Sequence, residues 1–244
     1  SDVWRKAMAG FQGAIRKVDT AVGAILDALR ASGLENDTLF VFTTDHGIEM
    51  PRAKWFLYDP GIAIGLIVRY PRGGLTGGRT CDLLMSNVDY LPTVFELAHL
   101  NVPGRVEGRS FASQLLASSP HPVRESVFAM HHKTQSRCIR TDRYKLIRHF
   151  DAPANYRTPV RYEEILMRGG GKRIELYDLI ADPNEFHNAA DQPELSGAKQ
   201  RLDGMLWSWM ESVNDPLLQG PVRTPSYEAA IQDYAAWKRQ RQSQ

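Results

Sequence analysis

Two apolar patterns follow one another at the start of the chain, and together they indicate an α/β fold. Apolar residues recur every three or four positions from Met8 to Leu29, which predicts one face of a long helix that ends near Gly33. A continuous β-branched and aromatic run follows from Thr38 to Thr44. Such a run directly after a helix is typical of a buried parallel strand.

Helix and strand signals continue to alternate up to about residue 117. The sequence predicts a second strand over residues 62–70, a helix over 89–99 with Asp89 as its N-cap, and a short helix over 111–116. This alternation is the pattern of a sheet that is covered by helices.

The pattern changes at residue 120. Closely spaced β-prone runs then predict an antiparallel meander over residues 126–130, 137–141, 144–150 and 174–179. An amphipathic segment at 195–213 predicts a helix that packs on this sheet. We therefore expect an α/β core part at residues 1–119, a small antiparallel-sheet subdomain with a helix at 120–219, and a C-terminal tail at 220–244.

Composition excludes several classes of protein. The 244 residues include 30 basic and 28 acidic side chains, so the chain lacks the strong basic excess that is typical of proteins that bind nucleic acid. No apolar run approaches the roughly 18 residues that cross a bilayer. Cys81 and Cys138 allow at most one disulfide and no cysteine-rich zinc site. Because the chain starts at Ser1 without a methionine or a signal peptide, we expect it to be a piece of a longer protein.

The residues best suited to chemistry follow the first predicted strand. Asp45, His46 and Gly47 come directly after Thr44, and open α/β sheets bind ligands outside the carboxyl ends of their strands. A carboxylate oxygen and an imidazole nitrogen are both competent metal ligands. The same residues also suit an aspartate cap and a partly buried histidine at an ordinary turn, so spacing alone leaves both interpretations open.

Lys54 lies nine residues beyond Asp45. A lysine that returns to the same crevice suits an anionic group such as phosphate or sulfate, because it offers a compact positive charge. Taken alone, it is equally an ordinary surface lysine. Arg52 either reads a second anionic group or is solvated.

These candidates lie within a series of short motifs at residues 18–23, 37–39, 44–47, 54–58, 87–94, 140–147, 175–179 and 182–185. In this order the motifs resemble the C-terminal part of a sulfatase of the alkaline phosphatase superfamily. The spacing from Asp45 to Lys54 and on to Gly61 is most similar to the N-sulfoglucosamine sulfohydrolase branch. The resemblance implies the C-terminal part of an alkaline-phosphatase-like α/β sandwich, followed by a small antiparallel sheet with a packed helix.

The resemblance also implies a reaction. Sulfatases hydrolyse sulfate esters or sulfamates with a formylglycine nucleophile and one divalent cation. Asp45 and His46 match two of the four ligand positions of that cation, and Lys54 matches the catalytic cation that contacts the sulfate and balances the transition-state charge. Ca²⁺ is the expected metal, and Mn²⁺ or Zn²⁺ are the alternatives because imidazole suits them better.

Three further residues are expected to bind substrate, which we expect to be a sulfated sugar or another sulfated small molecule. Arg52 lies beside Lys54, and His131 and His132 follow a predicted strand of the C-terminal subdomain. In sulfatases that subdomain overhangs the mouth of the active site, so either histidine can contact substrate or donate a proton to the leaving group. A pair of surface histidines in a loop is the alternative.

The family nucleophile has no counterpart in this sequence. It is a cysteine in a C-x-P-S-R motif, and neither Cys81 nor Cys138 lies in one. The resemblance thus implies that an N-terminal half of the same enzyme supplies the formylglycine and the other metal ligands. We predict that this chain alone hydrolyses nothing.

Three questions stay open at this point. A phosphonate monoester or phosphodiester hydrolase of the same superfamily is one alternative function, and a non-catalytic sulfatase-like binding module is the other. The resemblance implies a periplasmic, secreted or lysosomal location. The sequence leaves open whether the protein forms an oligomer.

Overall fold

The computed structural model describes residues 2–50, 52–131, 135–150, 174–220, 222, 232–235 and 239. Its chain divides into two compact units. The first consists of residues 1–44 and 65–123, and the second consists of residues 45–64 and 124–244. Among the described helices, none combines the length and the apolar character that crossing a membrane requires.

The first unit begins with the long helix that the apolar spacing predicts. Helix α1 (Asp2–Ala31) ends before Gly33, whose φ of +72° suits a glycine beyond a helix end. None of the residues of α1 is buried. Its exposed apolar side chains include Val3, Met8, Phe11, Ile15, Val18 and Ile25. The apolar stripe of α1 therefore enters no core in the described part of the chain.

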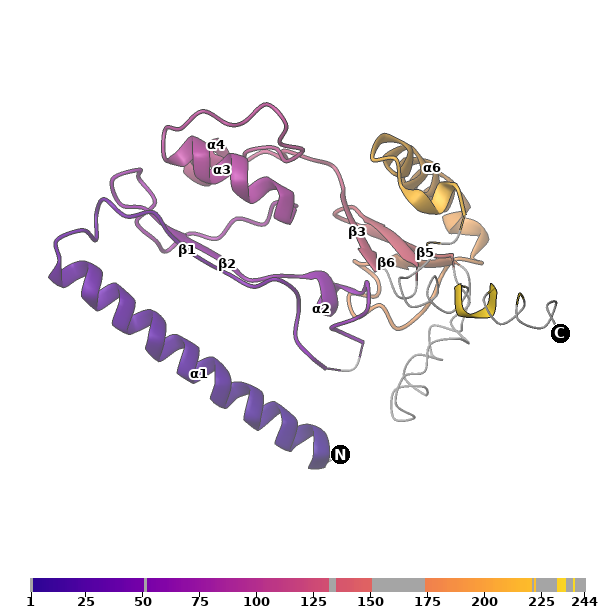
Figure 1. Ribbon diagram of the computed structural model, residues 1–244, viewed down its shortest axis with the longest axis horizontal. Helices are drawn as coiled ribbons and strands as arrows, with labels where there is room; N and C mark the ends of the chain where they lie inside the picture. The colour runs from indigo at the N-terminus through magenta and orange to yellow at the C-terminus, as the bar shows by residue number, and fades with distance from the viewer. Residues whose placement is uncertain are drawn as a thin grey trace. The chain divides into compact units, whose positions relative to one another are not determined.

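Strands β1 (Phe40–Thr43) and β2 (Leu66–Arg69) form a two-stranded antiparallel sheet (Figure 1). The expectation of a parallel strand at this position is wrong in its direction. The reason lies at the ends of the two strands, where the Thr44 amide donates to the Gly65 carbonyl at 3.3 Å and the Gly65 amide donates to the Thr44 hydroxyl at 3.0 Å. The chain leaves β1 and enters β2 at one point, whereas a parallel pair needs a crossover to the opposite end.

The predicted helix at 89–99 is confirmed, with Asp89 at its N-cap position and Leu97 as its last residue. A 3₁₀ turn (Asn87–Asp89) leads into α3 (Tyr90–Leu97), and α4 (Ala112–Leu116) follows. Ser86 is the first capping residue, and the Asp89 carboxylate accepts the Ser86 amide at 2.9 Å to complete a capping box. Asp89 thus caps this turn from its third position.

The second unit contains the predicted meander. Strands β3 (Val127–His131), β4 (Ser136–Arg140), β5 (Tyr144–His149) and β6 (Ile174–Asp178) pair antiparallel in chain order. Helix α6 (Ser196–Ser212) packs on this sheet as expected, between 3₁₀ turns at Pro193–Leu195 and Pro216–Leu218 (Figure 1). The stacked rings of Phe128 and Trp209, whose centroids lie 4.7 Å apart, join β3 to α6.

The sheet is covered on both faces, so the first four residues of β4, from Ser136 to Ile139, are all buried. On one face, side chains of the strands pack against α6, and the buried members of this core include Ile139, Leu146, Leu176, Leu202, Leu206 and Met210. On the other face, side chains pack against the segment that precedes β2, and this core includes Leu57, Tyr58, Cys138, Ile147 and Tyr177. Burial of each large apolar side chain stabilises the unit by about 1.5–3 kcal/mol.

Residues 45–64 therefore belong with the C-terminal sheet, although the sequence grouped them with residues 1–119. This segment includes the short helix α2 (Asp59–Ile62). The sheet thus positions the segment that carries most of the predicted site residues. His132 and most of the predicted tail at 220–244 lie outside the described residues.

Candidate functional site

The predicted site residues Asp45, His46 and Lys54 lie on one loop that runs from the end of β1 to α2. The Lys54 amide donates to the Ile48 carbonyl at 2.9 Å, so the backbone returns at Lys54 to a point two residues beyond His46. The Gly47 amide donates to the Gly61 carbonyl at 2.9 Å, which joins the start of the loop to α2. These two bonds bring residues nine positions apart onto one compact turn.

Two glycines permit this close approach of backbone to backbone. A Cβ atom on Gly47 would clash with the Pro60 carbonyl, and a Cβ atom on Gly61 would clash with the carbonyls of Ala53 and Phe56. Only glycine fits at either position without displacing the loop.

Asp45 and His46 present their side chains to solvent. The Asp45 side chain is 87% exposed, that of His46 is 42% exposed, and His46 Nε2 lies 3.6 Å from Asp45 Oδ1. The Nδ1 atom of His46 lies 2.8 Å from the Gly47 carbonyl oxygen. Because a carbonyl only accepts hydrogen bonds, Nδ1 carries the proton, and the lone pair of the neutral ring is on Nε2, on the side of the Asp45 carboxylate.

This pair fits part of a cation site. A carboxylate oxygen and an imidazole lone pair at this separation can both reach one divalent cation. Within the described ranges, however, there is no group of three or more His, Cys, Asp or Glu side chains that could hold a metal. Asp45 and His46 therefore provide two donors of this kind.

Lys54 is held loosely. Its side chain is 29% exposed, and its Nζ atom lies 3.3 Å from Glu49 Oε2 on a glutamate side chain that is 75% exposed. Exposed ion pairs contribute little to stability, so an incoming anion can replace Glu49 at low cost. The arrangement leaves a cation available to a bound anion.

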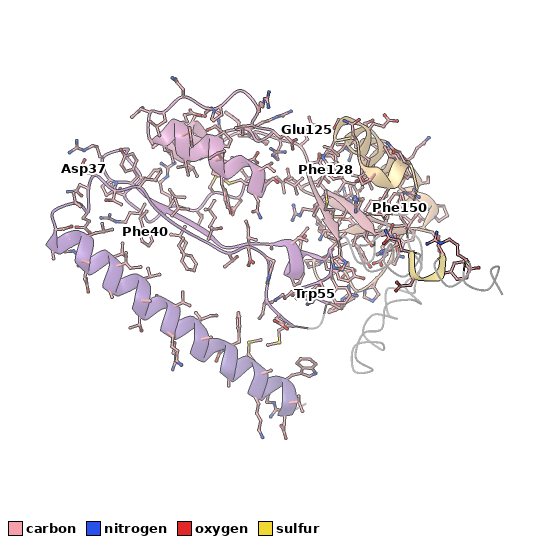
Figure 2. All side chains as sticks on the ribbon, viewed as in Figure 1. Asp37, Phe40, Trp55, Glu125, Phe128 and Phe150 are labelled. Carbon is pink, nitrogen blue, oxygen red and sulfur yellow. The ribbon has the colours of Figure 1, made fainter. Side chains whose placement is uncertain are left out.

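Trp55 brings two predicted site residues together. Lys54 Nζ lies 5.9 Å from the centre of the Trp55 ring system, and the ring of His131 meets Trp55 edge to face with a centroid distance of 6.1 Å. His131 thus lies at the loop that carries Lys54. The sequence analysis missed Trp55, which is 45% exposed and follows Lys54 directly (Figure 2).

Arg52 is not solvated, so that alternative is wrong. The residue is only 7% exposed, and its guanidinium lies 3.8 Å above the ring of Tyr58. Its Nη2 atom donates to the carbonyl of Glu185. Its Nη1 atom has no hydrogen-bond partner among the described residues. Arg52 anchors the loop and keeps one donor without a partner there.

A buried charge cluster fastens the loop to the sheet. Lys145 of β5 has no exposed side-chain surface, and it pairs with Asp59 and with Glu185, the latter at 2.7 Å. The Glu185 carboxylate also accepts the Asp59 amide at 2.5 Å, and Arg140 lies 3.2 Å from the Asp59 carboxylate. One lysine thus joins the first residue of α2 to the loop that follows β6.

The two carboxylates of this cluster differ in their pKa. Burial raises the pKa of Glu185 above its ordinary value, and the charge of Lys145 opposes this only in part. Burial acts in the same direction on Asp59, but Lys145 and Arg140 outweigh it and hold the pKa of Asp59 below its ordinary value. Asp59 is therefore the better stabilised anion of the two.

A second buried network lies on the same face of the sheet. Glu175 accepts hydrogen bonds from Tyr58 at 2.9 Å and from Tyr177 at 2.5 Å, and His149 Nε2 lies 2.9 Å away. Burial favours the neutral acid, but the hydrogen bond and charge of His149 and the two phenols outweigh it and lower the pKa of Glu175. Burial also raises the pKa of the Cys138 thiol on this face to about 12, so this cysteine is inert as a nucleophile.

The sequence patterns did not indicate the buried cluster, although its members lie in or beside the motifs that carry the resemblance. Lys145 and Glu185 come from the motifs at 140–147 and 182–185, and Asp59 directly follows the motif at 54–58. A charged residue in an apolar strand such as β5 was the available signal, because buried charges require partners. The partners of Lys145 lie 86 positions before and 40 positions after it in the chain, so no local spacing could indicate which residues they are.

Comparisons with known proteins give the family. The family described as N-sulphoglucosamine sulphohydrolase, C-terminal, matches residues 50–212, about two-thirds of the chain. The human N-sulphoglucosamine sulphohydrolase is 28% identical over 244 aligned residues, which cover 85% of this chain and 48% of that protein. An ulvan-active sulfatase of Formosa agariphila is 29% identical, with 90% of this chain and 46% of that protein covered. The chain thus spans less than half the length of these relatives.

Solved structures share the fold. A protein in complex with its substrate D-glucosamine-2-N,6-O-disulfate matches 83% of this chain and 40% of its own with a TM-score of 0.67 and 25% identity. A phosphonate monoester hydrolase from Silicibacter pomeroyi matches 80% of this chain and 39% of its own with a TM-score of 0.61 and 22% identity. The second likeness is one of fold alone.

Proposed function

We propose that this chain, which belongs to the family of N-sulphoglucosamine sulphohydrolase C-terminal regions, is the C-terminal part of a hydrolase of sulfate esters or sulfamates on a sulfated sugar. The observation that carries the proposal is the single compact loop that holds Asp45, His46 and Lys54. The relatives support a sulfated substrate, since they include an N-sulphoglucosamine sulphohydrolase and an ulvan-active sulfatase.

Asp45 and His46 would hold a divalent cation from one side. The Asp45 carboxylate and the Nε2 lone pair of His46 suit Ca²⁺ as the first choice, with Mn²⁺ or Zn²⁺ as the alternatives. When bound, such a cation would offset the negative charge of sulfate oxygens, and a formylglycine outside this chain would supply the nucleophile. Within this chain, the task of Asp45 and His46 is to fix the place of the anion.

Lys54 would act as the catalytic cation. Its ammonium group exchanges the exposed Glu49 carboxylate for a sulfate oxygen. A positive charge fixed at that oxygen stabilises the charge that develops as the bond to sulfur breaks. The bond of the Lys54 amide to Ile48 keeps the residue at this position before substrate arrives.

Arg52, His131 and His132 would contact the remainder of the substrate. The Nη1 atom of Arg52, which has no partner among the described residues, suits an anionic group. His131 lies at Trp55 beside the loop, where an imidazole can donate a proton to a leaving group. For His132, the proposed contact with substrate rests on the sequence alone.

The rest of the proposed enzyme would be an N-terminal half of the same polypeptide. The apolar stripe of α1, which buries none of its residues, supports this, because an apolar surface of that length is typical of a buried contact. We further propose that this chain alone is inactive and that the enzyme acts in the periplasm, outside the cell or in a lysosome.

Substrate turnover and metal content of the full-length gene product test the proposal. We expect sulfate release from D-glucosamine N-sulfate by protein that contains calcium. Turnover of a phosphonate monoester by protein that contains manganese or zinc would favour the alternative hydrolase, for which the imidazole of His46 is the supporting observation. Binding of the sulfated sugar without turnover would favour a binding module instead.

A further inference from the structure

Trp55 is an exposed aromatic residue that belongs to neither core of the second unit. It is 45% exposed, whereas Phe56, Leu57 and Tyr58, which follow it, all pack against the sheet. A tryptophan left at the surface contributes little to the core, and aromatic side chains with a polar neighbour are typical of ligand sites. The position therefore requires an explanation other than packing.

The backbone holds Trp55 in an unfavourable conformation. Its φ is +78°, and that of Arg52 is +60°, in a region that residues other than glycine rarely adopt. Such strain persists only where surrounding contacts enforce it, and it is concentrated at functional sites. Here the contacts are the stacking of Arg52 on Tyr58, its bond to the Glu185 carbonyl, and the bond of the Phe56 amide to the Ala53 carbonyl at 2.9 Å.

The strained loop aligns three different groups. A cation and an imidazole both lie near the Trp55 ring, with Lys54 Nζ 5.9 Å and the ring of His131 6.1 Å from its centre. His131 comes from β3, so the sheet supports the indole from a second element. An ammonium group and an aromatic surface side by side suit a ligand that has an anionic group next to an apolar ring face.

We propose that Trp55 is the platform on which the sugar ring of the substrate stacks while Lys54 binds its sulfate. This inference rests on the proposed function. It names the residue that makes the site bind a sulfated sugar more tightly than free sulfate. The C–H face of a pyranose supplies the apolar surface, and the sulfate supplies the anion. Trp55 then governs affinity for the ring, and Lys54 governs affinity for the charge.

Kinetics of Trp55 variants in the full-length gene product test the platform. With D-glucosamine N-sulfate, Trp55→Ala raises KM about tenfold, since loss of one aromatic stacking contact changes affinity by about that factor. Trp55→Phe recovers most of the affinity, and inhibition by inorganic sulfate stays within about twofold of the wild type in both variants. The control Ile180→Ala, which truncates a side chain that is 73% exposed in the same unit, leaves KM unchanged.

A binding measurement keeps the test independent of turnover and of folding defects. Titration with D-glucosamine N-sulfate changes the tryptophan fluorescence of the wild type, and the conservative variant Trp55→Phe removes most of that change. Inorganic sulfate changes the fluorescence of neither protein. An unchanged KM in Trp55→Ala, or the full fluorescence change in Trp55→Phe, overturns the platform and leaves the proposed function intact. If the wild type neither binds nor hydrolyses the sulfated sugar, the proposed function fails and the platform fails with it.

Discussion

Glu185 and Lys145 form an ion pair of 2.7 Å in which neither side chain has any exposed surface. The same glutamate accepts the Asp59 amide, and its backbone carbonyl accepts a hydrogen bond from Arg52. One residue therefore holds the site loop in its middle, through Arg52, and at its end, through Asp59. The position of Lys54 depends on a charge cluster whose central pair, Lys145 and Glu185, has no exposed side-chain surface.

Removal of Lys145 should release the loop. Lys145→Met leaves the carboxylates of Asp59 and Glu185 without their shared cation, and breaking a buried ion pair in this way costs about 3–5 kcal/mol. We expect that loss in the free energy of unfolding of the full-length gene product, measured by urea denaturation. Arg143→Met is the control, because it breaks an exposed pair with Asp178 near the same strand and should change stability far less. Equal effects of the two substitutions would contradict the anchoring role of the cluster.

The two crowded glycines should tolerate no side chain. Gly61→Ala places a Cβ atom against the carbonyls of Ala53 and Phe56, and we expect a loss of stability of about 1–3 kcal/mol together with a loss of activity. Gly65→Ala is the matched control, since a Cβ atom there meets nothing within 4 Å. Thermal unfolding and turnover of both variants check the prediction, which fails if Gly61→Ala behaves like Gly65→Ala.

Acid should destabilise the second unit. Burial opposes ionisation of Asp215, but its paired hydrogen bonds with Arg137, at 2.5 and 2.9 Å, outweigh burial and lower its pKa. The pKa values of Glu175 and Asp59 are also lowered. A carboxylate whose pKa is lower in the folded state stabilises the fold above its unfolded pKa, and that stability is lost as the pH falls through the folded pKa.

We therefore expect the free energy of unfolding to fall as the pH drops from about 5 towards about 2. Glu185 acts in the opposite direction, because its pKa is raised: its contribution is fully present below its ordinary pKa and is lost as the pH rises through the raised pKa of the folded state. Urea denaturation across this pH range measures the net effect of all these carboxylates on the free energy of unfolding. Asp215→Asn should make the free energy of unfolding less dependent on pH in this acidic range. A pH dependence identical to that of the wild type would show that the ion pair of Asp215 with Arg137 does not contribute to the acid sensitivity.

Glu49 should compete with the substrate for Lys54. Glu49→Gln removes the carboxylate 3.3 Å from Lys54 Nζ, so the lysine no longer exchanges one anion for another. The substitution should lower KM for a sulfated sugar about two- to fivefold, the scale of an exposed ion pair, and leave kcat nearly unchanged. Steady-state kinetics of the full-length gene product measure this. A higher KM would mean that Glu49 positions Lys54 instead of competing for it.

Local patterns in the sequence predicted the elements of the second unit well. Strand β5 and helix α6 lie within two residues of their predicted bounds, because alternation and helical spacing depend only on neighbouring residues. The direction of β1 against β2 was wrong, since hydrogen bonds between Thr44 and Gly65 decide it and local propensity does not.

The candidate site was only partly visible in the sequence. Asp45, His46 and Lys54 fall on one loop, but Trp55 escaped notice because neither its exposure nor its positive φ follows from residue type. The pairing of Asp59 with Lys145 escaped for a different reason: the two residues are 86 positions apart and meet only after the loop packs on the sheet.

Sulfate release by site variants of the full-length gene product tests the central claim most directly. With D-glucosamine N-sulfate, Lys54→Met should lower kcat/KM by about 100-fold or more, because a preorganised charge at the reacting oxygens is lost. Asp45→Ala should abolish turnover, and Asp27→Ala, on an exposed face of α1, should leave it unchanged. Turnover at the wild-type rate in Lys54→Met and Asp45→Ala would contradict the assignment of this loop as the active site.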